Sequence, residues 1–175
     1  MKKTSIIAAL VEHKPGVLFR VSNMFRRRGF NIDSITVGQS EHKDLARMTI
    51  TVNGDDTTRE QVVKQLRKLV EVVYVDLLPK NNTVQRELVL AKLKVGGAEA
   101  RREVMDYTGI FRGRVVDVST ESMIVEITGT PDKVDAFIDL VKKYGILEIA
   151  RTGITALVRG KESYYDSFME NTGGD

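Results

Sequence analysis

The sequence holds few side chains that could carry covalent chemistry. It has no cysteine, and its two histidines are His13 and His42. A thiol nucleophile, a disulfide and most structural zinc sites are therefore excluded, and neither histidine stands in a recognisable metal-ligand or catalytic pattern. The chain also lacks a Gly-x-Ser-x-Gly elbow and the glycine-rich loops that cradle nucleotides. We expect no catalytic residue, no metal and no cofactor in this chain.

Non-covalent binding has a better candidate in the segment from Glu12 to Leu18. There Pro15 and Gly16 precede an apolar helix pattern, and the first N–H groups of a helix have no partner within it and can hold a carboxylate. Glycine lets a ligand approach the backbone, and Asn31 has an amide that can both accept from an ammonium and donate to a carboxylate. An amino acid carries both charges. Taken alone, Pro-Gly is also an ordinary helix start, and Asn31 an ordinary turn residue.

The elements around these residues follow a β-α-β-β-α-β order, which is the ferredoxin-like unit. Hydrophobic periodicity and turn residues set the expected boundaries. They are a strand at 4–11, a helix with Pro15 in its first turn and Gly29 at its end, strands at 30–37 and 45–52, a helix opened by a Thr57–Glu60 capping box, and a strand at 72–78.

A polar, turn-forming segment at 79–83 separates this unit from a second copy of the same pattern. The second copy is expected to hold a strand at 84–95, a helix from 98 to 105, a hairpin of 114–119 with 123–128, a helix capped by Thr130 and stopped by Gly145, and closing strands at 146–158. The predicted fold class is α+β, with a first ferredoxin-like domain at 1–78, a linker at 79–83, a second ferredoxin-like domain at 84–160 and a flexible tail at 161–175. Sheets with helices on one face only leave the other face or their edges to be covered, so we expect a homodimer.

Composition places the chain among ordinary soluble globular proteins, with 42% hydrophobic and 29% charged residues. The apolar run near the N-terminus is short and ends in Glu12, His13 and Lys14, which is typical of a strand and not of a signal peptide. No apolar run approaches the roughly 18 residues of a membrane span. We expect a cytoplasmic protein with no membrane partner.

Nucleic acid is also not expected as a partner. The formal net charge is only +3, and the one dense basic cluster, Arg26-Arg27-Arg28, lies where cations favour a helix C-terminus. Arg28-Gly29-Phe30 matches the beginning of an RNA-recognition motif of the same topology, but Asn31 and Ile32 break the match. Aromatic residues make up 6% of the chain, which leaves few platforms for stacked bases.

Several separate segments resemble one family, the small regulatory subunits of acetolactate synthase (acetohydroxyacid synthase). The resemblance covers about residues 3 to 160 and both modules. It rests on Lys14-Pro15-Gly16-Val17-Leu18, Arg28 to Val37, Arg47 to Ile50, Gln65 to Val70, Arg86-Glu87-Leu88, Ile110 to Arg114, Asp135-Ala136-Phe137 and Glu148 to Gly153.

The resemblance implies an ACT domain that binds a branched-chain amino acid, valine first, between two protomers. By the same inference Gly16, Val17 and Leu18 offer N–H groups to the valine carboxylate, while Asn31 and Ile32 close the site from the partner protomer. The chain itself is then not an enzyme. It is expected to activate a catalytic large subunit that holds thiamine diphosphate, FAD and magnesium, and to confer feedback inhibition on it.

Two features go beyond the implied site. The family commonly has Asn immediately before the residue that matches Lys14, whereas this sequence has His13. A charged His13 side chain would make effector affinity depend on pH. The alternative is that His13 is a solvated loop residue. Phe111, Arg112 and Arg114 combine an aromatic with two cations and are expected to contact the large subunit. The alternative function is a freestanding amino-acid-sensing regulator of another enzyme or of transcription, although no segment is left for a DNA-reading element.

Overall fold

The computed structural model describes residues 3–160, and the chain forms two compact units. Of the described residues, 3–84 and 154–160 form one unit, and Gln85–Gly153 form the other. The chain therefore leaves the first unit, builds the second and returns to the first after Gly153. The predicted tail at 161–175 lies outside the described residues. No helix within residues 3–160 is long and apolar enough to cross a lipid bilayer.

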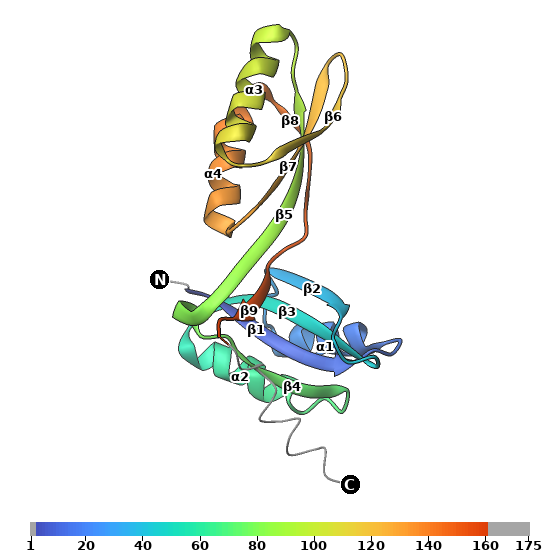
Figure 1. Cartoon of the computed structure of the whole chain (residues 1–175). Helices are drawn as coiled ribbons and strands as arrows, with labels where there is room; N and C mark the ends of the chain where they lie inside the picture. The colour runs from blue at the N-terminus through green and yellow to red at the C-terminus, as the bar shows by residue number, and fades with distance from the viewer. Residues whose placement is uncertain (1–2, 161–175) are drawn as a thin grey trace. The chain divides into compact units, whose positions relative to one another are not determined.

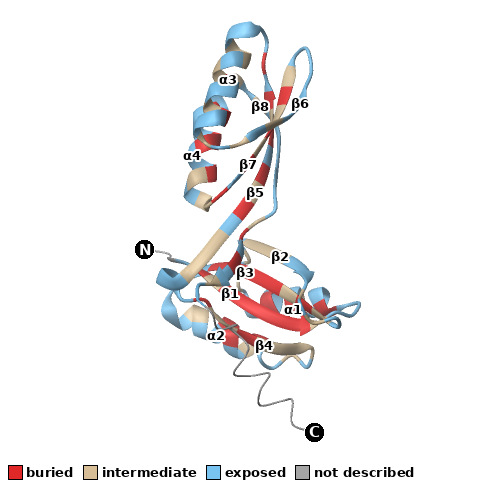
Figure 2. Ribbon diagram, in the orientation of Figure 1, coloured by how far each residue is buried: buried red, intermediate tan, exposed pale blue. Residues whose placement is uncertain are grey.

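The first unit has the expected β-α-β-β-α-β order, and its antiparallel sheet has the strand order β2-β3-β1-β4 (Figure 1). Its elements are β1 (Lys3–Glu12), α1 (Val17–Arg28), β2 (Ser34–Gln39), β3 (Leu45–Gly54), α2 (Asp56–Leu66) and β4 (Val72–Leu77). β1 is buried along most of its length (Figure 2), and alternate residues of it face the helices. The core on this face is formed mainly by Ile7, Ala9, Val11, Val21, Phe25, Met48, Ile50, Val62 and Leu66.

The end of α1 is set by Gly29 in a left-handed conformation, with φ of 69°. The Gly29 N–H donates to Arg26 O at 3.2 Å, and the Phe30 N–H donates to Phe25 O at 3.0 Å. This is the hydrogen-bond pattern of a Schellman motif, and the rings of Phe25 and Phe30 supply its apolar contact at 6.4 Å between centroids. Phe30 is thus tied to the helix, and the strand begins at Ser34 and not at Phe30 as expected.

Both helix starts in the first unit differ from the sequence-based expectation. Pro15 precedes α1 instead of occupying its first turn, because Gly16, with φ of 88°, turns the chain before the helix begins at Val17. The Thr57–Glu60 capping box is also wrong. Asp55 is the N-cap of α2, and its carboxylate accepts from the Thr58 N–H at 2.8 Å.

The second unit repeats the topology, with strand order β6-β7-β5-β8 and helices on one face of the sheet (Figure 1). Its elements, after the short helix η1 (Lys80–Asn82), are β5 (Thr83–Lys94), α3 (Ala98–Ile110), β6 (Arg114–Val118), β7 (Ser122–Gly129), α4 (Pro131–Val141), η2 (Lys142–Tyr144) and β8 (Ile146–Arg151). The predicted closing segment divides in two, because β8 completes this sheet while β9 (Thr155–Val158) follows the return to the first unit and also pairs with β5.

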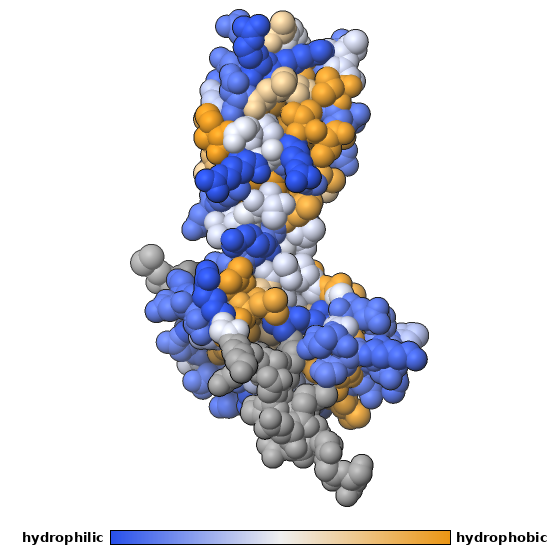
Figure 3. All heavy atoms as spheres, viewed as in Figure 1, coloured by the Kyte–Doolittle hydropathy of each residue, from blue (hydrophilic) through white to orange (hydrophobic). Residues whose placement is uncertain are grey.

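The core of the second unit lies between its sheet and its two helices and includes Val89, Leu93, Val104, Met123, Ile127, Val134, Phe137 and Val141. Apolar side chains also remain at the surface, among them Val116, Val118 and Leu147. Figure 3 shows apolar surface on this unit between charged side chains.

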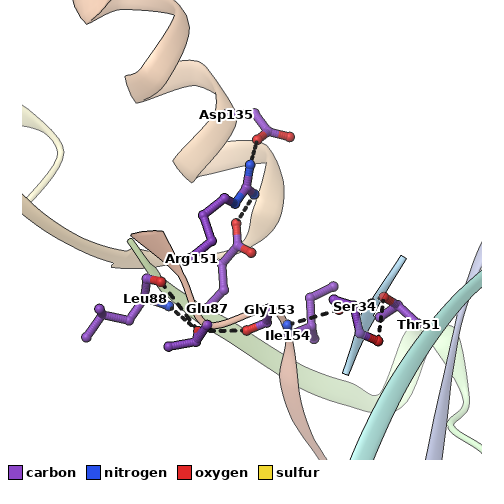
Figure 4. Close-up of polar contacts among 9 residues, drawn as sticks. Ser34, Thr51, Glu87, Leu88, Asp135, Arg151, Gly153 and Ile154 are labelled. Carbon is purple, nitrogen blue, oxygen red and sulfur yellow. Dashed lines mark hydrogen bonds and ion pairs between the residues drawn. The ribbon is translucent and has the colours of Figure 1, made fainter. Parts of the chain in front are cut away.

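A charged cluster ties β5, β8 and α4 together within the second unit. The Glu87 side chain is only 4% exposed and pairs with Arg151, which also donates to Asp135 Oδ1 at 2.7 Å. Figure 4 shows the Arg151 guanidinium between the two carboxylates. Burial opposes the charge on Arg151, yet the hydrogen bonds to Glu87 and Asp135 raise its pKa above the ordinary value.

The end of α3 forms a second Schellman motif, here with an arginine in the left-handed position. The Arg112 N–H donates to Gly109 O at 2.9 Å and the Gly113 N–H to Thr108 O at 2.8 Å, while Arg112 has φ of 52°. This conformation costs a side-chain-bearing residue about 1–2 kcal/mol relative to glycine. We expect Arg112→Gly to raise the free energy of unfolding by about 1 kcal/mol, measured by urea denaturation. An unchanged or lower value would contradict this explanation of the α3 terminus.

Candidate functional site

The loop between β1 and α1 is held at its beginning by two backbone hydrogen bonds. The Glu12 N–H donates to Glu71 O at 2.9 Å, and the His13 N–H donates to Asp44 O at 2.8 Å. Beyond this anchored stretch, Pro15 and Gly16 form an exposed turn that leads into Val17, whose side chain is buried in the core. The buried Val17 fixes the first turn of α1 while Gly16 stays open to solvent.

The helix start is not capped by any side chain, and its first turn contains no acidic residue. Within the described residues, no hydrogen bond satisfies the backbone N–H groups of Gly16, Leu18 and Phe19, and the Val17 N–H makes only a long contact of 3.5 Å to Lys14 O. Open N–H groups at a helix N-terminus carry partial positive charge and bind anions. The terminus is therefore suited to a carboxylate, with Phe19 in addition to the predicted residues.

Two of the cations around this loop are paired with carboxylates of the chain itself. Arg20 pairs with Glu71 at 2.7 Å and so ties the first turn of α1 to the segment before β4. Lys14 lies 3.2 Å from Glu12 and is itself exposed, as is His13. The open N–H groups at the start of α1 are therefore the feature of this loop that would attract an anion.

Asn31 and Ile32 lie far from this helix start within one chain. Ser34, which follows them, is paired with Thr51, and Thr51 is paired with Ile6 near the beginning of β1. The open helix start instead follows Glu12 at the other end of the same strand. Six residues of a strand span about 20 Å. The predicted residues therefore form two half-sites at opposite ends of the first unit, and a single unit does not bring them together.

The predicted partner-contact residues have different surroundings. Phe111 is half-buried, and its ring packs edge-on against Phe137 with centroids 5.4 Å apart. Arg112 and Arg114 are exposed. Phe111 thus supports the core of the second unit, and the two arginines are the part of this cluster that is open to a partner.

The fold and this helix start together define a class: a two-module α+β protein whose first module has a helix N-terminus without a side-chain cap. Comparison with known proteins is more specific. Residues 7–74 match the family model described as the AHAS small subunit-like ACT domain, and residues 86–160 match the model described as the small subunit of acetolactate synthase.

Full-length relatives agree with both matches. The chain is 53% identical over 160 residues to a probable acetolactate synthase small subunit of Methanothermobacter thermautotrophicus, covering 91% of this chain and 95% of the relative. It is 56% identical over 162 residues to the corresponding protein of Archaeoglobus fulgidus, covering 93% and 99%. The crystal structure of the acetolactate synthase small subunit from Thermotoga maritima superposes with a TM-score of 0.84 at 48% identity, covering 91% of this chain and 99% of that one. The chain belongs to the family of acetolactate synthase small subunits.

Proposed function

We propose that this chain is the amino-acid-sensing subunit of an acetolactate synthase. It binds a branched-chain amino acid, valine first, at the start of α1, and it activates a catalytic large subunit and makes that subunit sensitive to feedback inhibition. The observation that carries the proposal is the set of open N–H groups at Gly16, Leu18 and Phe19. The membership of the chain in the small-subunit family supports the choice of partner.

The separation of the two half-sites supports a binding site shared between two copies of the chain. β2 is an edge strand of the first sheet, and Leu18, Phe19 and Val37 are exposed apolar residues on α1 and β2. Apolar residues beside an unpaired strand edge favour association with a second copy. In such a homodimer a two-fold axis brings Asn31 and Ile32 of one protomer to Gly16 of the other. The amide of Asn31 then meets the ligand's charged groups, and Ile32 meets its apolar side chain.

In this proposal the chain performs no chemistry of its own. Thiamine diphosphate, FAD and magnesium belong to the large subunit, and the small subunit changes the rate through the free energy of association. A ligand that binds one arrangement of the subunits more tightly shifts the complex toward it, and the coupling is reciprocal. The complex would work in the cytoplasm, where valine, leucine and isoleucine are made.

Reconstitution tests the function directly. The purified chain is added to the large subunit from the same organism, and acetolactate formation is followed with and without valine, leucine or isoleucine. We expect the chain to raise the rate several-fold and valine to reverse the increase. A rate and an amino-acid response that are unchanged by the chain would overturn the proposal and favour the freestanding regulator.

The role of His13 is tested by pH. A protonated imidazole beside the valine carboxylate should strengthen binding, so we expect valine affinity to be about 2–5-fold higher at pH 6 than at pH 8, the range for an exposed ion pair. Calorimetric titrations at both pH values measure this, and His13→Asn should remove the difference. Equal affinities for the unaltered chain would identify His13 as a solvated loop residue.

Arg112 and Arg114 are proposed to meet acidic groups on the large subunit. Arg114→Glu should weaken the association measured by titrating the large subunit with the small one. Lys133→Glu, a charge reversal at a half-buried lysine of α4, is the comparison. Equal effects of the two variants would remove this surface from the proposal.

A further inference from the structure

The return segment of the chain lies on a face of the first sheet that its helices do not cover. After Gly153, Ile154 and Ala156 turn inward and are only 8% and 2% exposed, and they pack with Ala8 and Leu78 in a small apolar cluster. Ala8 alternates along β1 with Ile7 and Ala9, which face the helices. The segment Ile154–Val158, which we name the strap, therefore covers the opposite face of the sheet.

Polar side chains of β2 and β3 form hydrogen bonds with the backbone of the strap. The Thr36 hydroxyl donates to Ile154 O at 3.0 Å, and the Arg47 guanidinium donates to Ala156 O at 2.8 Å. The Ile154 N–H points to Ser34 Oγ at 3.5 Å, and Ser34 shares a hydrogen bond of 2.6 Å with Thr51 (Figure 4). Because these hydrogen bonds are made to main-chain atoms, they fix the position of the strap backbone on the sheet.

β2, which makes most of these contacts, begins directly after the segment with Asn31 and Ile32, one half of the proposed binding site. Among the strands of residues 3–160, β2 lies at the edge of the sheet and pairs with β3 alone. Asn31 lies three residues before Ser34, in a segment held by the Asp33 N–H donating to Thr51 O at 2.9 Å. The strap is thus a second support for β2, on the face opposite to the helices, and its release would loosen the position of Asn31.

The strap has little buried apolar surface, and its residues Thr155–Val158, which form β9, are held in addition by pairing with β5. Only Ile154 and Ala156 are buried, whereas Thr155 is exposed and Leu157 is 61% exposed. Segments with few buried apolar contacts open locally at a lower free energy than the core of a domain. The strap is also the continuation of β8, so the chain that leaves the second unit after Arg151 is anchored here.

We propose that the strap is a conformational tie that reports the state of the effector site to the second unit. Effector binding restricts the positions of Asn31 and β2. An ordered β2 in turn holds the strap through Thr36 and Ser34. Effector binding and docking of the strap therefore favour each other. This inference rests on the proposed function of the α1 terminus. By reciprocity, anything that pulls on the strap from the second unit changes effector affinity.

The natural chain has no cysteine, so a single introduced thiol reports the strap without background. Ala156→Cys places the thiol in the strap, and Ala9→Cys places one at an equally buried position on the helix side of β1. Labelling by an aromatic disulfide reagent is timed with and without saturating valine, and calorimetry on the same variants measures valine binding. We expect valine to slow labelling at position 156 at least about 5-fold more than at position 9, the lower range of allosteric coupling.

A second arm uses Thr36→Val, which keeps the shape of the side chain and removes its hydrogen bond to Ile154. It should speed labelling at position 156 by about 5-fold, which corresponds to one net hydrogen bond. If Ala156→Cys fails to fold, hydrogen exchange of the amides at 154–158 in the unaltered chain gives the same comparison. Measured valine binding with equal protection at positions 156 and 9 overturns the tie and leaves the proposed function standing. Absence of valine, leucine and isoleucine binding overturns both.

Discussion

Replacing Gly16 by valine is expected to lower the affinity for the effector by about 10–100-fold. The φ of Gly16 is 88°, and a Cβ added there meets nothing within 4 Å, so the cost is conformational and not a clash. A β-branched residue avoids this region, and the strain of about 1–3 kcal/mol is relieved by rotating the turn. That rotation turns the N–H groups of Gly16 and Leu18 away from the carboxylate, and a hydrogen bond to a charged group is worth about 1.5–3 kcal/mol.

Calorimetric titration with valine measures the loss, and Gly96→Val is the matched control. Gly96 also has open space where a Cβ would stand, but its φ is not in the left-handed region. The control should keep the affinity of the unaltered chain. Full affinity in Gly16→Val would show that the turn before α1 does not form the binding site.

Removing Arg151 is expected to have the largest effect on stability. Arg151→Met leaves the Glu87 carboxylate, whose side chain is 4% exposed, without its cation. Uncompensated buried charges cost about 3–5 kcal/mol. Because the Arg151 side chain is itself 36% exposed, solvent screens part of this interaction, and we expect the free energy of unfolding to fall by about 2–4 kcal/mol.

Urea denaturation of the double variant Arg151→Met with Glu87→Met separates charge from packing. If the loss comes from an unpaired carboxylate, the double variant should recover most of it, because an apolar pair avoids desolvation altogether. A double variant less stable than either single variant would assign the effect to packing. Asp135 stays exposed in all of them and needs no compensation.

The parts of the fold that depend on local periodicity were predictable from the sequence. Strand alternation predicted both βαββαβ units. The apolar stripe predicted α1, and Gly29 correctly marked the end of that helix. Helix starts were less predictable, since they depend on competition between neighbouring groups. Asp55 caps α2 in place of Thr57, and the φ of Gly16 prevents Pro15 from joining α1.

The path of the strap could not be read from local patterns. Ile154 and Ala156 alternate as in any half-buried strand, and alternation does not say which face of which sheet their side chains cover. The hydrogen bonds from the strap to Ser34, Thr36 and Arg47 were equally unpredictable. Hydroxyl and guanidinium groups on a strand are ordinarily expected to face solvent. The left-handed Arg112 carried no signal either, since glycine is the residue that marks such a position.

The two candidate half-sites were predicted from residue types, but their separation was not. Open N–H groups at Gly16 and Leu18 follow from helix geometry, whereas the distance to Asn31 depends on the pairing of β1, β2 and β3. Because of that pairing, the two half-sites can form one site only between two copies of the chain. The Phe19 N–H belongs to the open groups because no side chain caps the start of α1, and the sequence pattern does not predict that.

The most direct test of the central claim follows the amide protons of Gly16, Leu18 and Phe19 by NMR in the nitrogen-15-labelled chain. The chain is titrated with valine and, separately, with valinamide, which keeps the ammonium and the side chain but lacks the carboxylate. Carboxylate binding at the α1 terminus predicts saturable downfield shifts of these three amides with valine and none with valinamide. Unmoved amides at saturating valine, or equal shifts with both compounds, would contradict it.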